Sequence, residues 1–221
     1  MKTNELSVKL NAIMEKWDFS GCISICKDSE VIYQGYHGYA DYEAGKLNNL
    51  ETRFLIASVT KQFTAACVMM LVEEGKINLQ HTLDNYLPEY TYASQITIRQ
   101  MLNMMSGIPD MINEVIVEEI EQDKTERTQE EQLIFEYQTQ SRCFPLSEVL
   151  ELVNNRELNF EPGTSMNYSN TNYSFLGFIV ERLSGQSLGT FMEERIFKPL
   201  HMNETTCNPS MATSIGYARM D

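Results

Sequence analysis

The sequence predicts a mixed α/β protein of the α+β type, in which the N-terminal strands of an antiparallel sheet precede a helical lobe. Two patterns predict this class. β-Prone residues gather before residue 42, and apolar residues recur at three- and four-residue spacing after residue 57. The 221 residues suffice for one or two domains, and 43% hydrophobic with 22% charged residues is typical of a folded chain.

The first elements are a helix and a pair of strands. Residues 6–17 place apolar side chains on one helical face, which predicts an amphipathic helix. Residues 21–33 contain two β-prone runs around a polar turn at residues 27–30, and this pattern predicts two short strands. Residues 35–41 continue as strand or loop, with glycines.

Helices dominate the rest of the chain. Ser58 opens an apolar periodic stretch that Gly75 closes, which predicts a helix of about four turns with Ser58 at its N-terminal position. A break at residues 106–110 precedes a Glu- and Gln-rich stretch at 114–137, which we interpret as a solvated helical insertion. Further helices are predicted at residues 97–105, 146–153, 173–183 and 191–197.

These elements divide the chain into three parts. Residues 1–56 hold the first helix and strands, residues 57–205 form the mostly helical lobe, and residues 206–221 return toward the strands. We find no convincing strand after residue 56. Because even three strands need a covered face, we expect either helices over a very small sheet or strands that this chain does not contain.

Composition excludes several classes of partner. With 17 basic and 31 acidic residues, the net charge of −14 disfavours binding to nucleic acids and anionic membranes. No apolar run approaches the roughly 18 residues of a membrane span, and no signal peptide precedes the first helix. We therefore expect a cytoplasmic chain as given, or an extracytoplasmic one if a signal was removed.

The cysteines are five in number and scattered: Cys22, Cys26, Cys67, Cys143 and Cys207. An odd number without a CxxC pair predicts reduced thiols, most of them in the core, and a reducing compartment. His37, His81 and His201 have no metal-ligand spacing, and neither a Walker A nor a GxGxxG sequence occurs. We expect no metal and no nucleotide cofactor.

A Ser-x-x-Lys pattern occurs twice, at Ser24–Lys27 and at Ser58–Lys61. In a strand, positions three apart point to opposite faces, so Ser24 and Lys27 cannot meet. On a helix they are neighbours, so Ser58 and Lys61 can. A serine needs a base to act as a nucleophile, and a partly buried lysine amine at a helix N-terminus can be that base. The alternative is a capping serine followed by an exposed lysine.

A Tyr-x-Asn pattern, Tyr168-Ser169-Asn170, lies in a polar loop between a Pro-Gly turn and an apolar helix. A tyrosine beside a lysine can relay a proton to a leaving group. An asparagine amide can both donate to and accept from a substrate amide. The alternative is a loop in which Asn170 or Thr171 caps the following helix.

The segment 54–64, FLIASVTKQFT, resembles the nucleophile segment of the serine β-lactamases and penicillin-binding proteins, particularly the class C β-lactamase-like group. That group includes D,D-peptidases, D-amino-acid peptidases and esterases. Similar stretches follow in the same order at residues 71–79, 83–89, 96–102, 106–108, 160–164, 168–173 and 199–202.

The resemblance implies a role for each motif residue. Ser58 would be the acylated nucleophile, Lys61 its proton acceptor, Tyr168 the acid/base partner and Asn170 a substrate contact. The backbone N–H of Ser58 would be half of an oxyanion hole. The implied substrates are β-lactams, D-amino-acid peptides or esters, and the implied fold is that of the β-lactamases and transpeptidases.

Two departures from the family pattern matter. Residues 103–107 read NMMSG where the family commonly has HTSG, from which we expect a change in packing. The third family motif, Lys-Thr-Gly or His-x-Gly on a C-terminal strand, does not occur before Asp221. We therefore expect a truncated form with poor turnover, with an exposed sheet edge or strands exchanged with a second copy in a homodimer. A non-catalytic protein that binds a ligand or partner in the old cleft, and a purely structural role for both motifs, are the alternatives.

Overall fold

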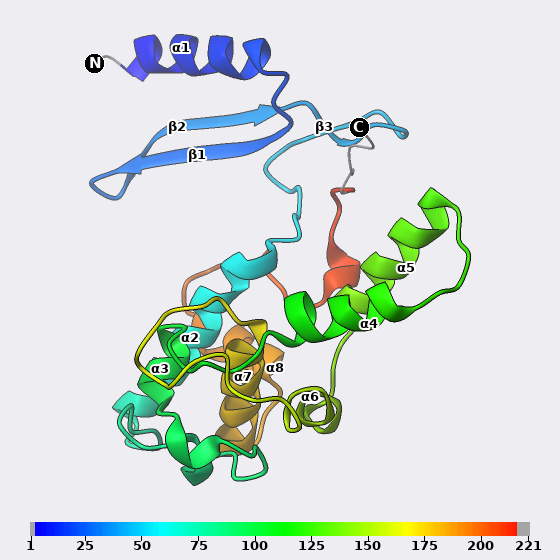
Figure 1. The fold of residues 1–221 in the computed structure, drawn as a ribbon. Coiled ribbons are helices and arrows are strands. Elements are labelled where there is room, and N and C mark those ends of the chain that lie inside the picture. The colour runs from blue at the N-terminus through cyan, green and yellow to red at the C-terminus, as the bar shows by residue number, and fades with distance from the viewer. Residues whose placement is uncertain (1–2, 216–221) are drawn as a thin grey trace. The chain divides into compact units, whose positions relative to one another are not determined.

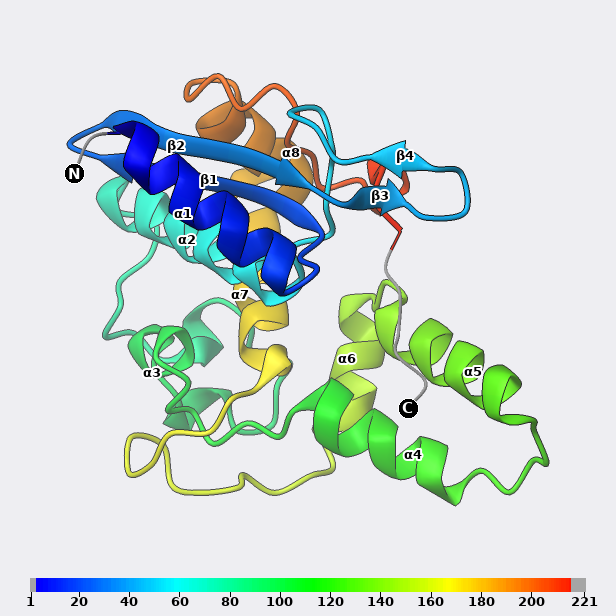
Figure 2. The same ribbon diagram turned by 90° about the horizontal axis from the view of Figure 1, so that it is seen from above.

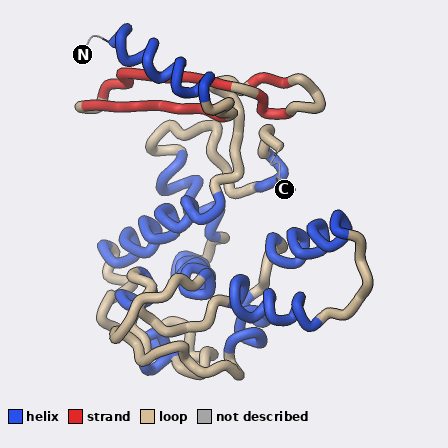
Figure 3. The backbone as a smooth tube through the Cα atoms, turned by 45° about the horizontal axis from the view of Figure 1, so that its top comes forward, coloured by secondary structure: helices blue, strands red, loops and turns tan. Residues whose placement is uncertain are grey.

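The computed structural model describes residues 3–215, which form two compact units (Figure 1). The strand unit contains residues 3–57 and 200–215, and the helical unit is Ser58–Pro199. Figure 3 shows the strands confined to the strand unit. The division predicted at residues 56 and 205 stays a prediction, and the last part of the predicted return segment, 216–221, lies outside the described residues.

A helix and a hairpin begin the strand unit: α1 (Thr3–Lys16), β1 (Gly21–Lys27) and β2 (Glu30–His37). The strands pair antiparallel, from Gly21 opposite His37 to Lys27 opposite Glu30. Asp28 and Ser29 form the turn with φ of 51° and 67°, the left-handed geometry of a tight hairpin turn. Figures 1 and 2 show α1 along one face of the hairpin, where the buried Tyr33 donates to Asn11 Oδ1 at 2.8 Å. The predicted helix and strand pair are confirmed.

A second, smaller sheet pairs β3 (Tyr39–Asp41) with β4 (Lys46–Leu47). Within residues 3–215 each sheet has two strands, so β1 and β2 each keep one edge without a strand partner. The mixed α/β class with a small antiparallel sheet is confirmed, whereas the exposed sheet edge stays a prediction. Strand exchange with a second copy stays a prediction.

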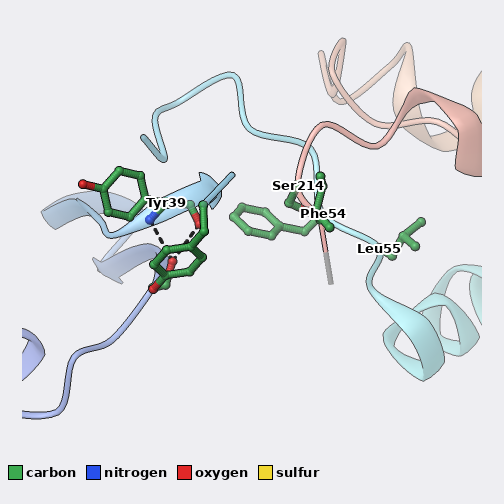
Figure 4. A pocket seen from close by; sticks show the side chains of 7 residues that line it. Tyr39, Phe54, Leu55 and Ser214 are labelled. Carbon is green, nitrogen blue, oxygen red and sulfur yellow. Dashed lines mark hydrogen bonds between the residues drawn. The ribbon is translucent and has the colours of Figure 1, made fainter. Parts of the chain in front are cut away.

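The returning segment completes the strand unit. It contains the 3₁₀ turn η6 (Pro209–Met211), and Thr213 N and Ser214 N donate to Arg53 O at 3.0 and 3.1 Å. A cavity of about 390 Å³ lies between this segment and β3 (Figure 4). It is lined by Ser20, Tyr39, Tyr42, Phe54, Leu55, Ser214 and Ile215.

Two packed helices form the centre of the helical unit: α2 (Lys61–Glu73) and α7 (Asn170–Ser184). Cys67 and Leu71 of α2 and Phe175 and Ile179 of α7 are buried in the core of the unit. The surrounding elements are η2 (Leu83–Asn85), η3 (Ala93–Gln95), α3 (Ile98–Leu102), α6 (Leu146–Val153), α8 (Leu188–Met192) and η5 (Glu193–Phe197). Apolar burial along these helices is the main favourable contribution to the stability of the unit.

The stretch predicted as a helical insertion forms an arm, visible in Figures 1 and 2. It consists of the π-helix η4 (Met111–Ile116), α4 (Val117–Gln122) and α5 (Gln129–Ser141). The helical prediction is confirmed, but the loop 123–128 interrupts it. There Asp123 pairs with Arg127, and Thr128 begins α5 with a capping box to Glu131.

Three details of the sequence prediction are wrong. Ser58 does not cap α2, because residues Ala57–Thr60 form a 3₁₀ turn (η1) and Thr60 takes the cap position. The helix α7 begins at Asn170 instead of residue 173, with Ser169 as its N-cap, so neither Asn170 nor Thr171 is the cap. Only Cys67 is buried, and the other four cysteines are exposed. No helix in the described chain combines the length and hydropathy that a bilayer crossing requires.

Candidate active site

The first two site residues lie where η1 runs into α2. Residues three apart in a 3₁₀ turn lie almost one above the other. Lys61 Nζ accordingly donates to Ser58 Oγ at 3.1 Å. The residue before the serine, Ala57, has a φ of 43°, a left-handed conformation that costs a non-glycine residue free energy. The turn thus places the side chains of Ser58 and Lys61 within hydrogen-bond distance of each other.

The other two site residues come from the segment that enters α7. Tyr168 OH lies 2.5 Å from Ser58 Oγ, and Asn170 Oδ1 accepts from Lys61 Nζ at 2.7 Å. Tyr168 OH also donates to Asn170 Oδ1 at 3.3 Å. Because α2 packs against α7, their N-terminal ends meet here. The structure therefore brings together all four residues predicted from the sequence, across a separation of 110 positions.

The lysine ammonium is surrounded by aromatic faces and amide oxygen. Lys61 Nζ lies 4.9 Å from the ring centroid of Tyr168 and 5.8 Å from that of Tyr173. Burial raises the pKa of Tyr173, with a smaller contribution from Tyr168, and its hydroxyl donates to Leu102 O at 3.1 Å. Tyr173 is therefore a neutral phenol at pH 7, anchored by the main chain.

This arrangement can activate a hydroxyl group. Ser58 Oγ has both an amine and a phenol oxygen within hydrogen-bond distance, so its proton has two routes away. Tyr168 is 41% exposed, which leaves the hydroxyl cluster accessible to a ligand from solvent. The same geometry does not occur at the other Ser-x-x-Lys copy, since Ser24 Oγ on β1 lies against Cys26 Sγ at 4.0 Å.

Asp110 is a neighbour of the site that the sequence did not reveal. Its carboxylate accepts from Asn170 Nδ2 at 3.0 and 3.2 Å, and the residue is only 1% exposed. In the sequence, residues 106–110 indicate only a break. An aspartate directly before an apolar stretch is an N-cap signal, and Asp110 does cap η4. The contact with Asn170, 60 positions away, leaves no local signal.

Two other features do not belong to the site. The cavity in the strand unit is lined by none of the four predicted residues. Within residues 3–215, no cluster of His, Cys, Asp and Glu side chains is arranged to hold a metal ion.

Known proteins are similar to this chain in sequence and in fold. Penicillin-binding protein 4* of Bacillus subtilis (strain 168) is 28% identical over 206 residues, which cover 92% of this chain and 41% of that protein. The penicillin-binding protein of Bacillus halodurans superposes with a TM-score of 0.71 at 28% identity, covering 89% of this chain and 56% of that one. The D-amino acid amidase of Ochrobactrum anthropi SV3 superposes with a TM-score of 0.56 at 26% identity, covering 81% of this chain and 44% of that one.

These similarities confirm the β-lactamase and transpeptidase-like fold predicted from the sequence. The chain spans about two fifths of the length of the curated relatives it matches. The family model described as Beta-lactamase matches residues 11–221, nearly the whole chain. By this match, the chain belongs to the β-lactamase family.

Proposed function

We propose that this chain is a serine hydrolase that forms an acyl-enzyme on Ser58 with an amide or ester substrate. The observation that carries the proposal is the pair of contacts to Ser58 Oγ, at 3.1 Å from Lys61 Nζ and 2.5 Å from Tyr168 OH. A serine with only a capping role needs neither contact. Two acid/base groups on one hydroxyl are what acyl transfer requires.

The proposed reaction has two steps. In its neutral form Lys61 accepts the Ser58 proton while Oγ attacks the carbonyl carbon, and the backbone N–H of Ser58 stabilises the developing oxyanion. The tetrahedral intermediate then expels the leaving group, which takes a proton from the Tyr168 hydroxyl. Lys61 passes the proton that it took from Ser58 to the Tyr168 phenolate. In the second step water attacks the Ser58 ester, and the same groups move the protons in the reverse order. Asn170 contacts the substrate while it holds Lys61.

The proposed substrates are small molecules or peptides with an activated or D-configured acyl group: β-lactams, D-amino-acid peptides and esters. Two matched relatives are named as a penicillin-binding protein and a D-amino acid amidase, which supports acyl-transfer chemistry of this class. The 221-residue chain spans less than half the length of its curated relatives, so acylation of Ser58 is the step to test first in this chain.

Intact-mass spectrometry tests the proposal. The chain is incubated with benzylpenicillin or with p-nitrophenyl acetate, and each adduct is mapped by peptide digestion. We expect the added mass of the whole β-lactam, or of one acetyl group, on Ser58. The Ser58→Ala variant is the control and should gain neither.

Two outcomes would contradict acylation. No adduct from either probe, together with no hydrolysis of either probe above that of the Ser58→Ala variant, rules out a nucleophilic Ser58 in this chain. Benzylpenicillin that binds wild type and Ser58→Ala equally, without an adduct, would favour the non-catalytic ligand-binding protein.

A further inference from the structure

We propose that Asp110 is a positioning residue that sets the orientation of the Asn170 amide, so that Oδ1 faces Lys61. The hydrogen bonds of Asp110 carry this inference, and its effect on rate rests on the proposed acylation of Ser58. Asn170 is the first residue of α7, and its two amide ends face opposite partners. Oδ1 accepts from Lys61 Nζ, and Nδ2 donates to both oxygens of Asp110.

The carboxylate of Asp110 is buried among N–H donors. Oδ1 accepts from the backbone N–H groups of Ile112 and Asn113 at 2.9 and 3.3 Å, and Oδ2 from Asn113 Nδ2 at 2.7 Å. No salt bridge within residues 3–215 includes Asp110. A buried carboxylate needs such donors to remain charged. The Asn170 amide is one of these donors, and it connects the carboxylate to Lys61.

A carboxylate accepts hydrogen bonds and an ammonium donates them. If the Asn170 amide were flipped, its oxygen would face the carboxylate of Asp110 and its NH₂ group would face the ammonium of Lys61. Both contacts would be repulsive, and the buried carboxylate and the half-buried Lys61 would each lose a hydrogen-bond partner. Asp110 therefore leaves the amide one favourable orientation, the one that presents an oxygen to Lys61.

The fold prevents Asp110 from turning away. Thr171, the neighbour of Asn170, donates through Oγ1 to Pro109 O at 2.7 Å and accepts from Met111 N at 2.9 Å. The residues on both sides of Asp110 are thus tied to one fully buried threonine. Ser106 Oγ also donates to Asn172 Oδ1 at 2.6 Å. Loop 106–111 is thus held to the start of α7 by these hydrogen bonds.

The variant Asp110→Asn separates positioning from capping. Asparagine is as good an N-cap as aspartate and has nearly the same volume, so η4 keeps its cap. An amide at position 110, however, offers a donor and an acceptor, and Asn170 can then bind it in either orientation. The matched control is Asn113→Ala, which removes the other side-chain donor to Asp110 from an exposed position.

We measure the rate of Ser58 acylation by benzylpenicillin with time-resolved intact-mass spectrometry. Asp110→Asn should slow acylation by about 10- to 100-fold, the size of effect that a misplaced supporting group has on an organised site. Its thermal midpoint should stay within a few degrees of wild type. Asn113→Ala should be acylated within about twofold of the wild-type rate.

An exchange of the two side chains supplies the rescue. Asn170→Asp places two carboxylates against each other, which disfavours the charged pair. In the double variant Asp110→Asn with Asn170→Asp, the amide and the carboxylate change places, so the two carboxylates no longer face each other and an oxygen still faces Lys61. The double variant should be acylated at least about tenfold faster than Asn170→Asp. A purely structural role for Asp110 predicts no recovery, and that result would overturn the proposal.

NMR of the Asn170 side-chain NH₂ group tests the inference independently of acylation activity. The NH₂ resonances are assigned by their loss in Asn170→Ser and should shift in Asp110→Asn. Unchanged resonances would overturn the role of Asp110 even if the wild type is acylated. A wild type that no probe acylates overturns the proposed function, while the resonances still decide whether Asp110 holds the amide.

Discussion

The hydroxyl of Tyr168 is the contact closest to Ser58, at 2.5 Å, and its position is the most informative single feature of the site. Tyr168 belongs to no helix and is 41% exposed, so packing alone does not explain its place. The phenol lies between the serine oxygen and the amide oxygen of Asn170. We infer that its hydroxyl contributes to chemistry more than to folding.

Tyr168→Phe tests this inference. Removing a group that transfers a proton in the transition state should slow acylation by about 10²- to 10⁴-fold. Because the ring remains, the free energy of unfolding should change by less than about 1 kcal/mol. Acylation kinetics and urea unfolding measure the two effects. Tyr92→Phe, which alters a tyrosine that contacts the ring of Tyr90, is the control and should acylate at the wild-type rate. Equal rates for Tyr168→Phe and wild type would exclude the proton-transfer role.

The sequence predicts the four candidate site residues, which the structure brings together, because the two motifs are short and chemically distinctive. Ser58 and Lys61 are three positions apart, and Tyr168 and Asn170 two, so local geometry relates the members of each motif. No local rule relates Asp110 to Asn170, because their contact depends on how a loop packs against the start of α7. The four motif residues could therefore be predicted from the sequence, whereas the hydrogen bonds from Asn170 to Asp110 could not.

At the scale of elements, the loop 106–111 has one conformational requirement. Gly107 has a φ of 77°, and a Cβ atom there would lie 2.2 Å from Phe160 O. Its own carbonyl accepts from Asn159 N at 2.8 Å. Position 107 therefore needs a residue without a side chain, because backbone cannot yield as a flexible side chain can.

Gly107→Ala should destabilise the protein by about 2–4 kcal/mol and slow acylation by moving the loop that holds Asp110. The matched control is Gly75→Ala, with a φ of 71° but no atom within 4 Å of the added Cβ. That change should cost only about 1 kcal/mol, the strain of a left-handed alanine. Urea unfolding compares the two variants. If both variants lost the same free energy of unfolding, the clash with Phe160 O would not contribute to the cost at position 107.

The long periodic elements were predictable from the sequence, and the short ones were not. The predicted helix at 146–153 coincides with α6, since its apolar positions all face one side. The strands β3 and β4, of three and two residues, are too short for an alternating pattern to appear. The sequence predicts that Ser58 begins the helix, whereas the structure has a 3₁₀ turn there, because helical spacing does not distinguish a three-residue from a 3.6-residue turn.

At the scale of the whole molecule, 31 acidic residues face only 17 basic ones. The stability of the fold therefore depends on where the Arg and Lys side chains lie relative to the carboxylates. Arg182 pairs with Glu89 and also donates to Tyr86 O at 2.7 Å, which ties α7 to the segment after η2. The hydrogen bond from Arg182 is the main reason that the pKa of Glu89 is lowered. Since the folded-state pKa is depressed, this stabilisation is present above the ordinary glutamate pKa of about 4.5 and is lost as pH falls through the folded value.

Glu89→Gln should therefore destabilise the protein at pH 7 but much less at pH 3.5. The difference at pH 7 should stay below about 1 kcal/mol, because the side chains of the pair are partly exposed. Urea unfolding at the two pH values measures it. Glu157→Gln, which changes an exposed carboxyl group, should leave the dependence on pH as in wild type. If the difference in unfolding free energy between wild type and Glu89→Gln were as large at pH 3.5 as at pH 7, the predicted pH dependence of the Glu89–Arg182 pair would be wrong.

The strand unit is assembled from two distant pieces of chain, and this has a consequence for the order of folding. Thr213 Oγ1 accepts from Arg53 N across 160 positions of sequence, whereas the helical unit is one continuous segment. Closing so long a loop in an unfolded chain is entropically unfavourable, and it becomes easier once the intervening residues are compact. During synthesis or refolding, Ser58–Pro199 can therefore reach its native contacts first, and residues 200–215 join the strand unit as a late event.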